Sequence, residues 1–354
     1  MARVFVTGGN GFMGSRIVHR LVDRGHDVVA LVGADLDREN LVDLDVEIRE
    51  LDLLDEQGVI EALEGGELLI HNAACYSFWE ADPDLIYRVN VDGTQHVMRA
   101  ARIHGYEKIV YTSSTATLTP SINREVETED SLFDLRSFQG HYKCSKVIAE
   151  IAVLREIASG LPVSIVHPTT VVGRGDRRPT PTGTLIIHFL NGIMLAYADT
   201  VLNVVDVDDV AEGHLLALER GVSGRQYILG GENLTMAEVT GLLSELTGIP
   251  APRVKLPPWL LLWAGHAAEW VANRVTHRKP IVDVEAALHS IANRASDSGR
   301  AKKELGYDPA PARVALAKAA GWFLEAGMCR ERARQRVEAD GRLRTYLEQL
   351  DDPF

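Results

Sequence analysis

The sequence predicts an α/β protein in which a doubly wound parallel sheet carries a smaller, mixed α/β lobe. Apolar strand patterns alternate with helix patterns through the first half of the chain, which is typical of a parallel sheet with helices on both faces. A glycine-rich turn follows the first strand directly. After about residue 166 the alternation gives way to runs of proline, threonine and glycine, such as Arg177–Gly183, and these runs predict the second lobe.

Six strands are expected in the main sheet, and two later strands are expected to return to it. The six are Val4–Thr7, Val28–Val32, Val46–Glu50, Leu68–His71, Lys108–Thr112 and Val163–Val166. The two later strands are Leu202–Val205 and Gln226–Leu229. Helices are expected over Leu85–His104, Tyr142–Ala158 and Met236–Leu246.

The loop after the first strand, Thr7–Gly14, has the composition of a dinucleotide-binding turn. Glycines allow a tight turn and a close approach of the backbone to a pyrophosphate. Gly8, Gly11 and Gly14 stand where a helix begins, so the free amides of the helix start point towards the negative charge. A strand precedes the loop, and a helix pattern and a second strand follow it. This context favours nucleotide binding over an ordinary turn.

The loop predicts that the main part of the chain is a Rossmann-type dinucleotide-binding domain, formed by residues 1–166 and about 200–230. Residues from about 167 to 200 and from 230 to 325 are expected to form a substrate-binding lobe over the carboxyl ends of the strands, where such sheets bind ligands. Residues 326–354 are charged and helix-prone, and we expect them to form a solvated C-terminal helical tail.

Composition and charge describe a globular protein that is acidic overall. Apolar residues make up 46% of the 354 residues and charged residues 25%, which is ordinary for a globular chain. The formal net charge of −13 argues against a nucleic-acid partner and against anionic membranes, because phosphate binding needs concentrated basic residues. Cys75, Cys144 and Cys329 match no zinc spacing, so we expect no metal and reduced thiols. The first strand leaves no room for a secretory signal, and we expect a cytoplasmic protein.

One apolar stretch, Leu256–Val271, resembles a membrane segment. Prolines, His266 and Glu269 interrupt it, and it is too short to span a bilayer, so we expect no stable membrane insertion. Three tryptophans recur in it at helical spacing: Trp259, Trp263 and Trp270. We expect them to form a packed helix face, and an interfacial membrane anchor is the alternative.

Tyr142 and Lys146 stand four residues apart on a predicted helix, and therefore on one face of it. A free tyrosine titrates at about 10 and transfers protons poorly at neutral pH unless a positive charge favours the phenolate. Lys146 can supply this charge. The strand that ends at Thr112 leads into a run of hydroxyl side chains, in which Ser114 can hydrogen-bond a carbonyl or hydroxyl group. The alternative is that these hydroxyls only satisfy the turn, but the combination favours catalysis.

These motifs occur in the order of the extended short-chain dehydrogenase/reductase family, which residues 1 to about 320 resemble. Within that family, the chain is similar to the NAD-dependent epimerase/dehydratase type, above all to hopanoid-associated sugar epimerases and dihydroflavonol 4-reductase-like proteins. The stretches that carry the likeness are Thr7–Gly14, His71–Ala74, Tyr87–Thr94, Tyr111–Leu118, His141–Lys146, Pro179–Gly183 and Tyr227–Asn233. The resemblance implies an NAD or NADP cofactor and a homodimer that pairs through the helices Leu85–His104 and Tyr142–Ala158.

The resemblance also implies roles for individual residues. Tyr142 becomes the general acid/base, and Lys146 its electrostatic partner and a ligand of the nicotinamide ribose. Ser114 becomes the hydroxyl that orients the substrate, with Thr115 as the alternative. Asn90 is implied to support the active-site backbone, with an ordinary polar position on a helix as the alternative. The other residues implied to bind the cofactor are Gly8, Gly11, Phe12, Met13, Gly14, Asp52, Leu53, Ala73, Ala74, His167 and Pro168.

Within that set, the resemblance implies that Asp52 contacts the adenine and that His167 and Pro168 lie near the nicotinamide amide. The end of the second strand leaves NAD and NADP both open. NAD enzymes often carry an acidic residue there for the ribose 2′-hydroxyl, and NADP enzymes an arginine for the 2′-phosphate. This chain has neither at the matching position, Gly33–Ala34; the nearest charged residues that follow are Asp35, Asp37 and Arg38.

Asp206 stands where related sequences often carry His, which predicts a different substrate selection. Asp208 and Asp209 are expected to cap the helix that follows, Val210–Leu218.

The predicted activity is hydride transfer at a secondary alcohol or ketone carbon of a small molecule, with a (nucleotide-)sugar as the first expectation. A nucleotide sugar needs basic groups for its diphosphate, and the candidates are Arg174, Arg177, Arg178 and Arg225, although exposed arginines are common. An NADPH-dependent reductase of ketones or aldehydes, similar to dihydroflavonol reductase, is the second hypothesis. A non-catalytic NAD(P)-binding sensor or scaffold is the third, and the Ser114, Tyr142 and Lys146 set argues against it.

Overall fold

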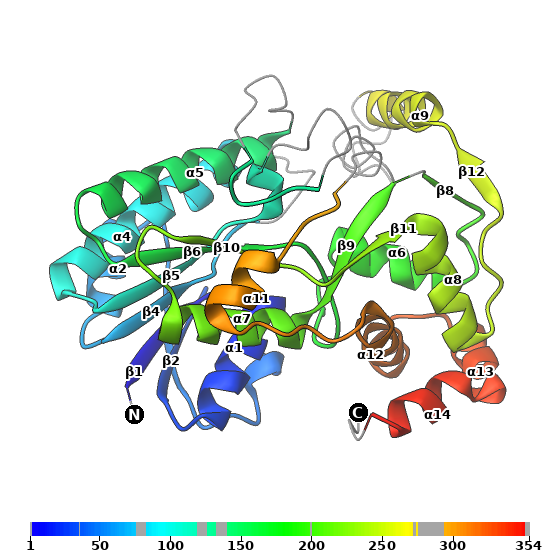
Figure 1. Cartoon of the computed structure of the whole chain (residues 1–354), viewed down its shortest axis with the longest axis horizontal. Helices are drawn as coiled ribbons and strands as arrows, with labels where there is room; N and C mark the ends of the chain where they lie inside the picture. Colours follow the sequence, from blue (N-terminus) through cyan, green and yellow to red (C-terminus); the bar gives the residue numbers. More distant parts are fainter. Residues whose placement is uncertain are drawn as a thin grey trace.

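A seven-stranded parallel sheet forms the centre of the main part of the chain (Figure 1). The computed structural model describes residues 2–34, 36–75, 83–118, 126–131, 140–198, 200–271, 274 and 294–350. The strand order is β10-β6-β5-β4-β1-β2-β3, and all neighbours run parallel. The strands are β1 (Arg3–Thr7), β2 (Asp27–Val32), β3 (Glu47–Glu50), β4 (Leu68–His71), β5 (Lys108–Thr112), β6 (Val163–Pro168) and β10 (Gln226–Leu229). This doubly wound order confirms the predicted fold class.

Helices cover both faces of this sheet (Figure 1). One face carries α2 (Glu56–Ala62), α4 (Gly93–His104) and α5 (His141–Ala158). The other face carries α1 (Phe12–Asp23), α7 (Val207–Arg220) and α11 (Gly299–Leu305). The helix predicted over Leu85–His104 is present but interrupted: α3 (Pro83–Tyr87) passes into a π-helical turn, η2 (Arg88–Asp92), before α4 begins. Such π turns are frequent at functional sites.

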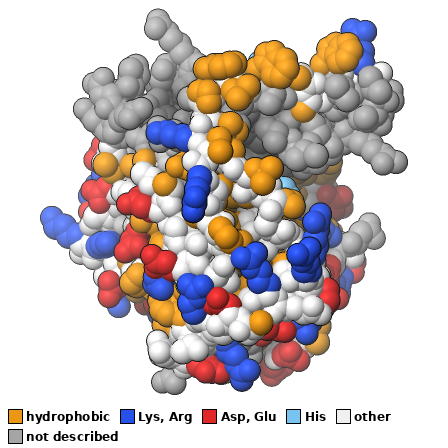
Figure 2. All heavy atoms as spheres, turned by 90° about the vertical axis from the view of Figure 1, so that its right-hand side faces the viewer, with side chains coloured by type: hydrophobic (Ala, Val, Ile, Leu, Met, Phe, Trp, Pro, Cys, Tyr) orange, Lys and Arg blue, Asp and Glu red, His pale blue; other side chains and the backbone are white. Residues whose placement is uncertain are grey.

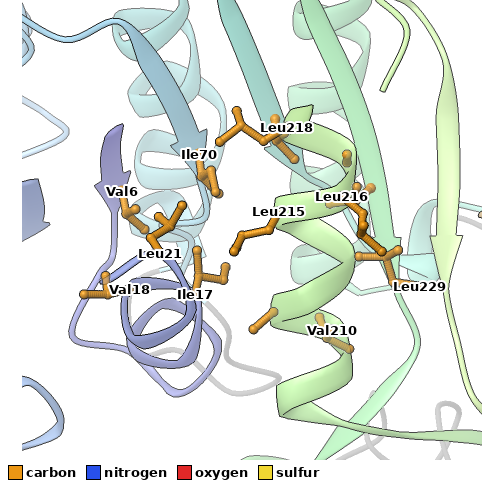
Figure 3. Close-up of a cluster of buried hydrophobic side chains, with 14 of the residues drawn as sticks. Val6, Ile17, Val18, Leu21, Ile70, Val210, Leu215, Leu216, Leu218 and Leu229 are labelled. Carbon is orange, nitrogen blue, oxygen red and sulfur yellow. The ribbon is translucent and has the colours of Figure 1, made fainter. Parts of the chain in front are cut away.

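Helices α1 and α7 pack against one another through apolar side chains at helical spacing (Figure 3). Ile17 and Leu21 lie one turn apart on α1, and Leu215 of α7 lies across from them. Each of the three is at most 1% exposed. Because α7 follows β9, which is described next, this packing ties the second lobe to the first βα unit of the sheet.

The second lobe contains two small sheets built from segments far apart in the sequence. β7 (Thr170–Val172), β9 (Val201–Asp206) and β11 (Glu232–Thr235) form one, in which β9 is parallel to β7 and antiparallel to β11. β8 (Ala196–Ala198) and β12 (Val254–Leu256) form the other. The helices of the lobe are α6 (Pro181–Leu190), α8 (Met236–Thr247), α9 (Pro258–Val271) and α12 (Ala312–Glu325). The lobe is therefore mixed α/β, as predicted.

One strand departs from the prediction. The strand expected over Leu202–Val205 exists as β9, but its membership of the main sheet is wrong, whereas Gln226–Leu229 does join that sheet as β10. β9 pairs instead with β7 and β11. β9 and β10 are both short and apolar, so their sequences alone do not distinguish them. They differ in the strands with which they pair, and the path of the chain sets these partners.

The C-terminal segment forms two helices, α13 (Glu331–Asp340) and α14 (Arg342–Glu348), and each buries an apolar stripe. Val337 and Leu343 belong to the same apolar cluster as Phe323 of α12 and Leu243 of α8. The expectation of a wholly solvated tail is therefore wrong, because a charged helix still packs if a few apolar residues recur every third or fourth position.

The tryptophans of α9 contradict the expected packed face. Trp259 is 68% exposed, Trp263 is 66% exposed and Trp270 is 62% exposed. Among the helices of the described residues, none combines the length and apolar character needed to cross a bilayer.

Candidate active site

The turn between β1 and α1 brings glycines where a larger residue does not fit. Gly8 has φ +67°, and a Cβ atom on it would lie 2.9 Å from the Cα atom of Ala73 at the end of the neighbouring strand β4. A Cβ atom on Gly14 would lie 2.0 Å from the carbonyl oxygen of Gly8. The Gly11 amide donates to that same oxygen at 3.0 Å. The loop is thus folded tightly against the sheet, with its backbone uncovered by side chains of its own.

The start of α1 favours an anion. Gly11 is the N-cap and has no side chain to cap the helix, and the first turn contains no acidic residue. Phe12 and Met13 are the first residues of the helix. Free backbone amides and the positive end of the helix dipole therefore meet at the glycine loop, as in sites that bind a pyrophosphate.

A buried chain of hydrogen bonds fixes the end of β4 to the end of β1. The Thr7 hydroxyl accepts from the amides of Asn72 and Ala73, each at 3.1 Å, and lies 2.8 Å from Nδ1 of His71. Nε2 of His71 lies 3.0 Å from the Thr94 hydroxyl on α4. Burial lowers the pKa of His71 to about 3, so the ring is neutral and acts as a structural link. Ala73, and Ala74 after it, are held beside the glycine loop.

Asn90, in the π-helical turn η2, joins three segments of the chain. Its side-chain oxygen accepts from the Cys75 amide at 2.7 Å, and its Nδ2 donates to the Cys75 carbonyl at 3.1 Å and to the Ser145 hydroxyl at 2.9 Å. Ser145 in turn donates to the carbonyl of Tyr142 at 2.7 Å. Asn90 is 1% exposed, so it is not an ordinary polar position on a helix surface. It connects the loop after β4 to the start of α5.

Tyr142 and Lys146 lie on one buried stripe of α5, as their spacing predicts. Tyr142 is 8% exposed and Lys146 is 4% exposed. The ammonium of Lys146 donates to the Thr112 carbonyl at the end of β5, at 2.8 Å, and lies 5.0 Å from the centre of the Tyr111 ring. Burial lowers the pKa of Lys146 to about 8. Lys146 is therefore a cation at neutral pH that titrates within the range of ordinary assays.

Ser114 and Thr115 differ in whether the hydroxyl group donates a hydrogen bond within the protein. Ser114 caps a short 3₁₀ turn, η3 (Thr115–Thr117), by accepting from the Ala116 amide at 3.1 Å, and it is partly exposed. Thr115 is buried and donates to the Pro168 carbonyl at 3.4 Å. The structural use of Ser114 as an acceptor leaves its proton for another group, while the Thr115 proton is committed. This difference favours Ser114 over its alternative.

His167 and Pro168 end β6, beside the end of β5. Nδ1 of His167 lies 3.2 Å from the Ser114 carbonyl, and its Nε2 lies 3.2 Å from the side-chain oxygen of Gln226. Both ring nitrogens are thus engaged by the protein. The His167–Pro168 backbone is fixed next to the hydroxyl cluster.

Glu150 is a buried polar residue of this site that the sequence reasoning missed. It lies one turn beyond Lys146 on α5 and is fully buried. The Ser113 hydroxyl donates to its Oε2 atom, Nδ1 of His167 lies 3.9 Å from the same atom, and its Oε1 atom has no hydrogen-bond partner within the described part of the chain. The negative charge of Glu150 raises the pKa of Lys146, against the effect of burial. The signal was the spacing Tyr142, Lys146, Glu150, which continues one helix stripe.

Comparison with known proteins identifies the family. A family model described as the NAD dependent epimerase/dehydratase family matches residues 4–230. The chain belongs to this family. It is 38% identical over 330 residues to a putative dihydroflavonol 4-reductase of Synechocystis, with 91% of this chain and 95% of that protein covered. It is 34% identical over 326 residues to sterol demethylase protein B of Methylococcus capsulatus, with 91% and 98% covered.

Solved structures agree with this family. The crystal structure of gox2253 has a TM-score of 0.83 and 41% identity, covering 93% of this chain and 100% of that one. A dTDP-glucose 4,6-dehydratase of Streptomyces venezuelae, DesIV, crystallised with NAD, has a TM-score of 0.74 and 25% identity, covering 94% and 98%. As a member of the NAD dependent epimerase/dehydratase family, the chain is an NAD(P)-dependent oxidoreductase of the extended short-chain dehydrogenase type, as the sequence motifs predicted. The free amides and the glycine loop fit such a cofactor.

Asp52 and Leu53 follow β3, at the adenine end implied by the family likeness. Asp52 is exposed, and its Oδ1 accepts from the Leu54 amide at 2.9 Å, which holds the turn. Leu53 is 9% exposed, and its carbonyl lies 2.8 Å from Nδ1 of His96 on α4. Asp52 is therefore an exposed carboxylate in a turn that hydrogen bonds hold in place.

The loop after β2 does not choose between NAD and NADP. Asp35 lies outside the described residues. The guanidinium of Arg38 pairs with Glu50 at 2.7 Å, and the carboxylate of Asp37 accepts from the Glu39 amide at 2.8 Å. Both charged side chains thus have internal partners, in a loop that precedes and includes the 3₁₀ turn η1 (Glu39–Leu41).

Three of the four arginines proposed for a diphosphate have partners inside the protein. Arg174 lies 3.8 Å from the carboxylate of Asp208. Arg177 pairs with Glu39 and donates to the Asn40 side chain. Arg225 pairs with Glu304 at 2.5 Å and stands just before β10, at the end of the sheet opposite to Tyr142. Arg225 therefore does not reach the site. Arg178 is exposed.

The cap of α7 is Asp206, and the expectation that Asp208 and Asp209 cap this helix is wrong. The Asp206 side chain accepts from the Asp208 amide at 2.9 Å, and its other oxygen lies 3.1 Å from the Lys318 ammonium on α12. Asp208, in the first turn, pairs with Arg16 of α1 at 2.5 Å. A carboxylate at the N-cap, directly before the first helical residue, satisfies the helix amides better than one inside the first turn.

Proposed function

We propose that the protein interconverts a ketone and a secondary alcohol, with Tyr142 as the proton donor and acceptor. The single observation that carries this proposal is the buried stripe of α5, where Tyr142 and Lys146 lie at the same carboxyl edge of the parallel sheet that carries the glycine loop. Burying a phenol and an ammonium group together costs free energy of folding, and such an arrangement is typical of groups that transfer protons.

In the reduction direction, Ser114 Oγ donates to the substrate carbonyl oxygen and holds it in place. The nicotinamide, when bound, supplies a hydride to the carbonyl carbon. The π electrons of the carbonyl move to its oxygen, which takes the phenolic proton of Tyr142. The Lys146 ammonium stabilises the resulting phenolate, which then regains a proton from solvent. Oxidation follows the same steps in reverse.

We assign the cofactor-binding residues from their positions along the carboxyl edge of the sheet. The loop of Gly8, Gly11 and Gly14, with the amides at Phe12 and Met13, holds the pyrophosphate. Asp52 and Leu53 bind the adenine end, while Ala73 and Ala74 pass beneath the cofactor. His167 and Pro168 lie at the nicotinamide end, and Lys146 also binds the nicotinamide ribose. Their common position, at the carboxyl edge of β1, β3, β4 and β6, supports this assignment.

The substrate that we propose is an apolar ketone rather than a nucleotide sugar. A diphosphate needs cations that are available for it, whereas Arg174, Arg177 and Arg225 already face carboxylates. The names of the two relatives given above refer to a dihydroflavonol and a sterol, and neither contains a phosphate. A nucleotide sugar is the second candidate, because the similar structure of DesIV is that of a dTDP-glucose dehydratase.

An assay of cofactor turnover separates these candidates. We expect NADH or NADPH to be consumed stoichiometrically with a panel of steroidal, flavonoid and 3-oxoalkyl ketones. Turnover of UDP- or dTDP-hexoses without net cofactor consumption would favour the epimerase instead. Tyr142→Phe should abolish either reaction, whereas Tyr346→Phe, far away on α14, serves as the matched control. Cofactor binding without any turnover would support a sensor or scaffold.

We also propose that the protein is a homodimer and acts in the cytoplasm. Ile148 and Ile151 on α5 are 45% and 40% exposed, and Ile103 on α4 is 55% exposed, which supports pairing through these two helices. The three free cysteines support a reducing compartment. Sedimentation velocity should give a dimer that Ile151→Arg dissociates, and a monomeric wild-type protein would contradict the pairing.

A further inference from the structure

Helix α9 presents a row of tryptophans on the surface of the second lobe. Trp259, Trp263 and Trp270 are each more than three-fifths exposed. Figure 2 shows hydrophobic side chains gathered at this end of the molecule. Indole rings are among the side chains that a protein gains most by burying, so three exposed ones on a single helix call for a function.

Helix geometry puts the three rings on one stripe. At 3.6 residues per turn, positions 259, 263 and 270 fall within an arc of about 40° around the axis. His266 lies about 20° outside this arc, which widens the stripe to about 60°, and it is also exposed. Gly265 lies on the opposite side and is buried. The helix therefore has one face against the protein and an aromatic face, Trp259–Trp263–His266–Trp270, turned outwards.

Two further apolar side chains are exposed on the strands next to α9. Val254, on β12, is 56% exposed, and β12 runs directly into α9. Leu195 is 79% exposed and precedes Ala196, the β8 residue that pairs with Val254. Exposed apolar side chains therefore also occur in the two-stranded sheet that leads into α9.

The charge of this region differs from that of the whole protein. Residues 253–274 contain three basic residues, Arg253, Lys255 and Arg274, and one acidic residue, Glu269, for a net charge of +2, whereas the whole chain carries −13. All three basic side chains are exposed. Cations therefore flank an aromatic face in an otherwise acidic protein, which complements an anionic surface with an apolar interior.

We propose that the aromatic face of α9 docks on an anionic lipid surface. Tryptophan and histidine combine an apolar ring with a polar N–H group, and such side chains prefer the headgroup region of a bilayer. The helix has 14 residues, or about 21 Å, which is too short to span a bilayer but suits a helix lying flat in the interface. Arg253 and Lys255 then meet lipid phosphates at the start of the helix.

This docking explains how an acidic, globular enzyme obtains an apolar substrate. The second lobe, which carries α9, also contains the β7–β9–β11 sheet, whose strand β7 begins two residues after Pro168 at the proposed reaction site. A lipid surface under α9 would bring substrate to that lobe without passage through water. The docking rests on α9 alone and does not depend on which ketone is reduced.

Vesicle flotation with the full-length protein tests the proposal. The probes are vesicles of phosphatidylcholine alone and of phosphatidylcholine with about one-third phosphatidylserine. We expect flotation with the anionic vesicles and a blue shift of tryptophan emission. The double variant Trp259→Ser/Trp263→Ser should weaken binding about tenfold or more, and Arg253→Gln/Lys255→Gln roughly fivefold or more. The matched control removes two exposed apolar side chains elsewhere, Val42→Ser/Val222→Ser, and should float like the wild type.

The outcomes are decisive in both directions. Reduction of a detergent-dispersed ketone should be unchanged in Trp259→Ser/Trp263→Ser, so a failure of docking is distinct from a failure of catalysis. Flotation equal for the tryptophan variant and the control would overturn the proposal. A second result would also overturn it: wild-type protein that does not float with anionic vesicles, together with a tryptophan variant whose oligomeric state differs from that of the wild type. In that case the aromatic face would bind a second copy of the protein.

Discussion

The main sheet and the second lobe are built in different ways. Seven parallel strands, each joined to its neighbour by a helix or a longer crossover, place Thr7, His71, Thr112 and Pro168 at one edge of the main sheet. In the second lobe, β9 lies between β7, which is parallel to it and comes before it in the sequence, and β11, which is antiparallel and comes after it. We therefore propose that the main sheet supplies the reacting groups and that the second lobe selects the substrate.

The buried polar groups of the two regions show the same contrast. In the main sheet, Asn90, Lys146 and Glu150 form contacts that end at the proposed reaction site. In the second lobe, Lys318 bridges Asp206 and Asp208, which fastens α12 to α7. We propose that the first set positions the reacting groups, whereas the second set holds α12 of the lobe against α7. Variants in each region should therefore fail in different ways.

The largest effect is expected for Tyr142→Phe. Removal of the phenolic hydroxyl should lower kcat by about a thousandfold or more, because no proton is then delivered to the substrate oxygen. The Kd of the cofactor, measured by fluorescence titration, should change less than threefold or so, because the ring still packs. Loss of cofactor binding equal to the loss of turnover would contradict the division of roles.

Gly14→Ala should weaken cofactor binding without affecting the second lobe. The new Cβ atom would lie 2.0 Å from the Gly8 carbonyl oxygen, so the loop must move away from the pyrophosphate position. We expect cofactor affinity to fall about a hundredfold, as measured by calorimetry. Gly241→Ala on α8, where a Cβ atom meets nothing within 4 Å, is the control in the second lobe and should bind like the wild type.

Glu150→Gln should change the pH dependence of catalysis more than its maximum. The free enzyme should lose kcat/KM as pH rises through about 8, because Lys146, whose pKa burial lowers to about 8, then loses its proton. Without the Glu150 charge the pKa of Lys146 falls further, so the falling limb should move to lower pH. The buried titratable neighbours of this pair include His71, Tyr111, Tyr142 and His167. A limb at the same pH as in the wild type would exclude the positioning role.

The smallest effect is expected where segment 126–131 contacts the second lobe. Glu127 is 1% exposed, its amide donates to the Ala295 carbonyl at 2.7 Å, and burial raises its pKa to about 7. The folded state therefore holds a proton that the unfolded state releases at about 4.5, so this contribution to stability is present at low pH and lost as pH rises to about 7.

Glu127→Gln should remove that pH dependence. Relative to the wild type, the variant should gain roughly 1 to 3 kcal/mol in free energy of unfolding between about pH 5 and about pH 8. Urea denaturation at the two pH values measures the difference. The exposed Glu348→Gln is the control, and a parallel pH response of Glu127→Gln and the wild type would refute the assignment.

Much of the main sheet follows from local sequence, and little of the second lobe does. The strand pattern and the glycine loop gave β1, β4, β5 and the start of α1 because parallel strands buried on both faces read as apolar runs. The Tyr142–Lys146 pair was predicted because a four-residue spacing fixes a shared helix face. Glu150 was missed because a glutamate inside a helix is ordinarily exposed, and its burial depends on Ser113 and His167, which other strands supply.

The second lobe depends on contacts that no short stretch of sequence contains. The partners of β9 are set by chain segments that reach it from residues 170 and 235, so its apolar pattern suits either sheet. The tryptophans of α9 have the spacing of a packed face, and the same spacing also makes an exposed one. Periodicity locates a face on a helix but does not say what covers it.

The central claim is that the substrate carbon receives a hydride from the cofactor while its oxygen receives a proton from Tyr142, at the carboxyl edge of the main sheet. The most direct test is reduction of a ketone from the panel with cofactor deuterated at nicotinamide C4, followed by mass spectrometry of the product alcohol. We predict deuterium on the carbinol carbon with the wild type and no product above background with Tyr142→Phe. Unlabelled alcohol, or equal labelled product from both proteins, would contradict the account.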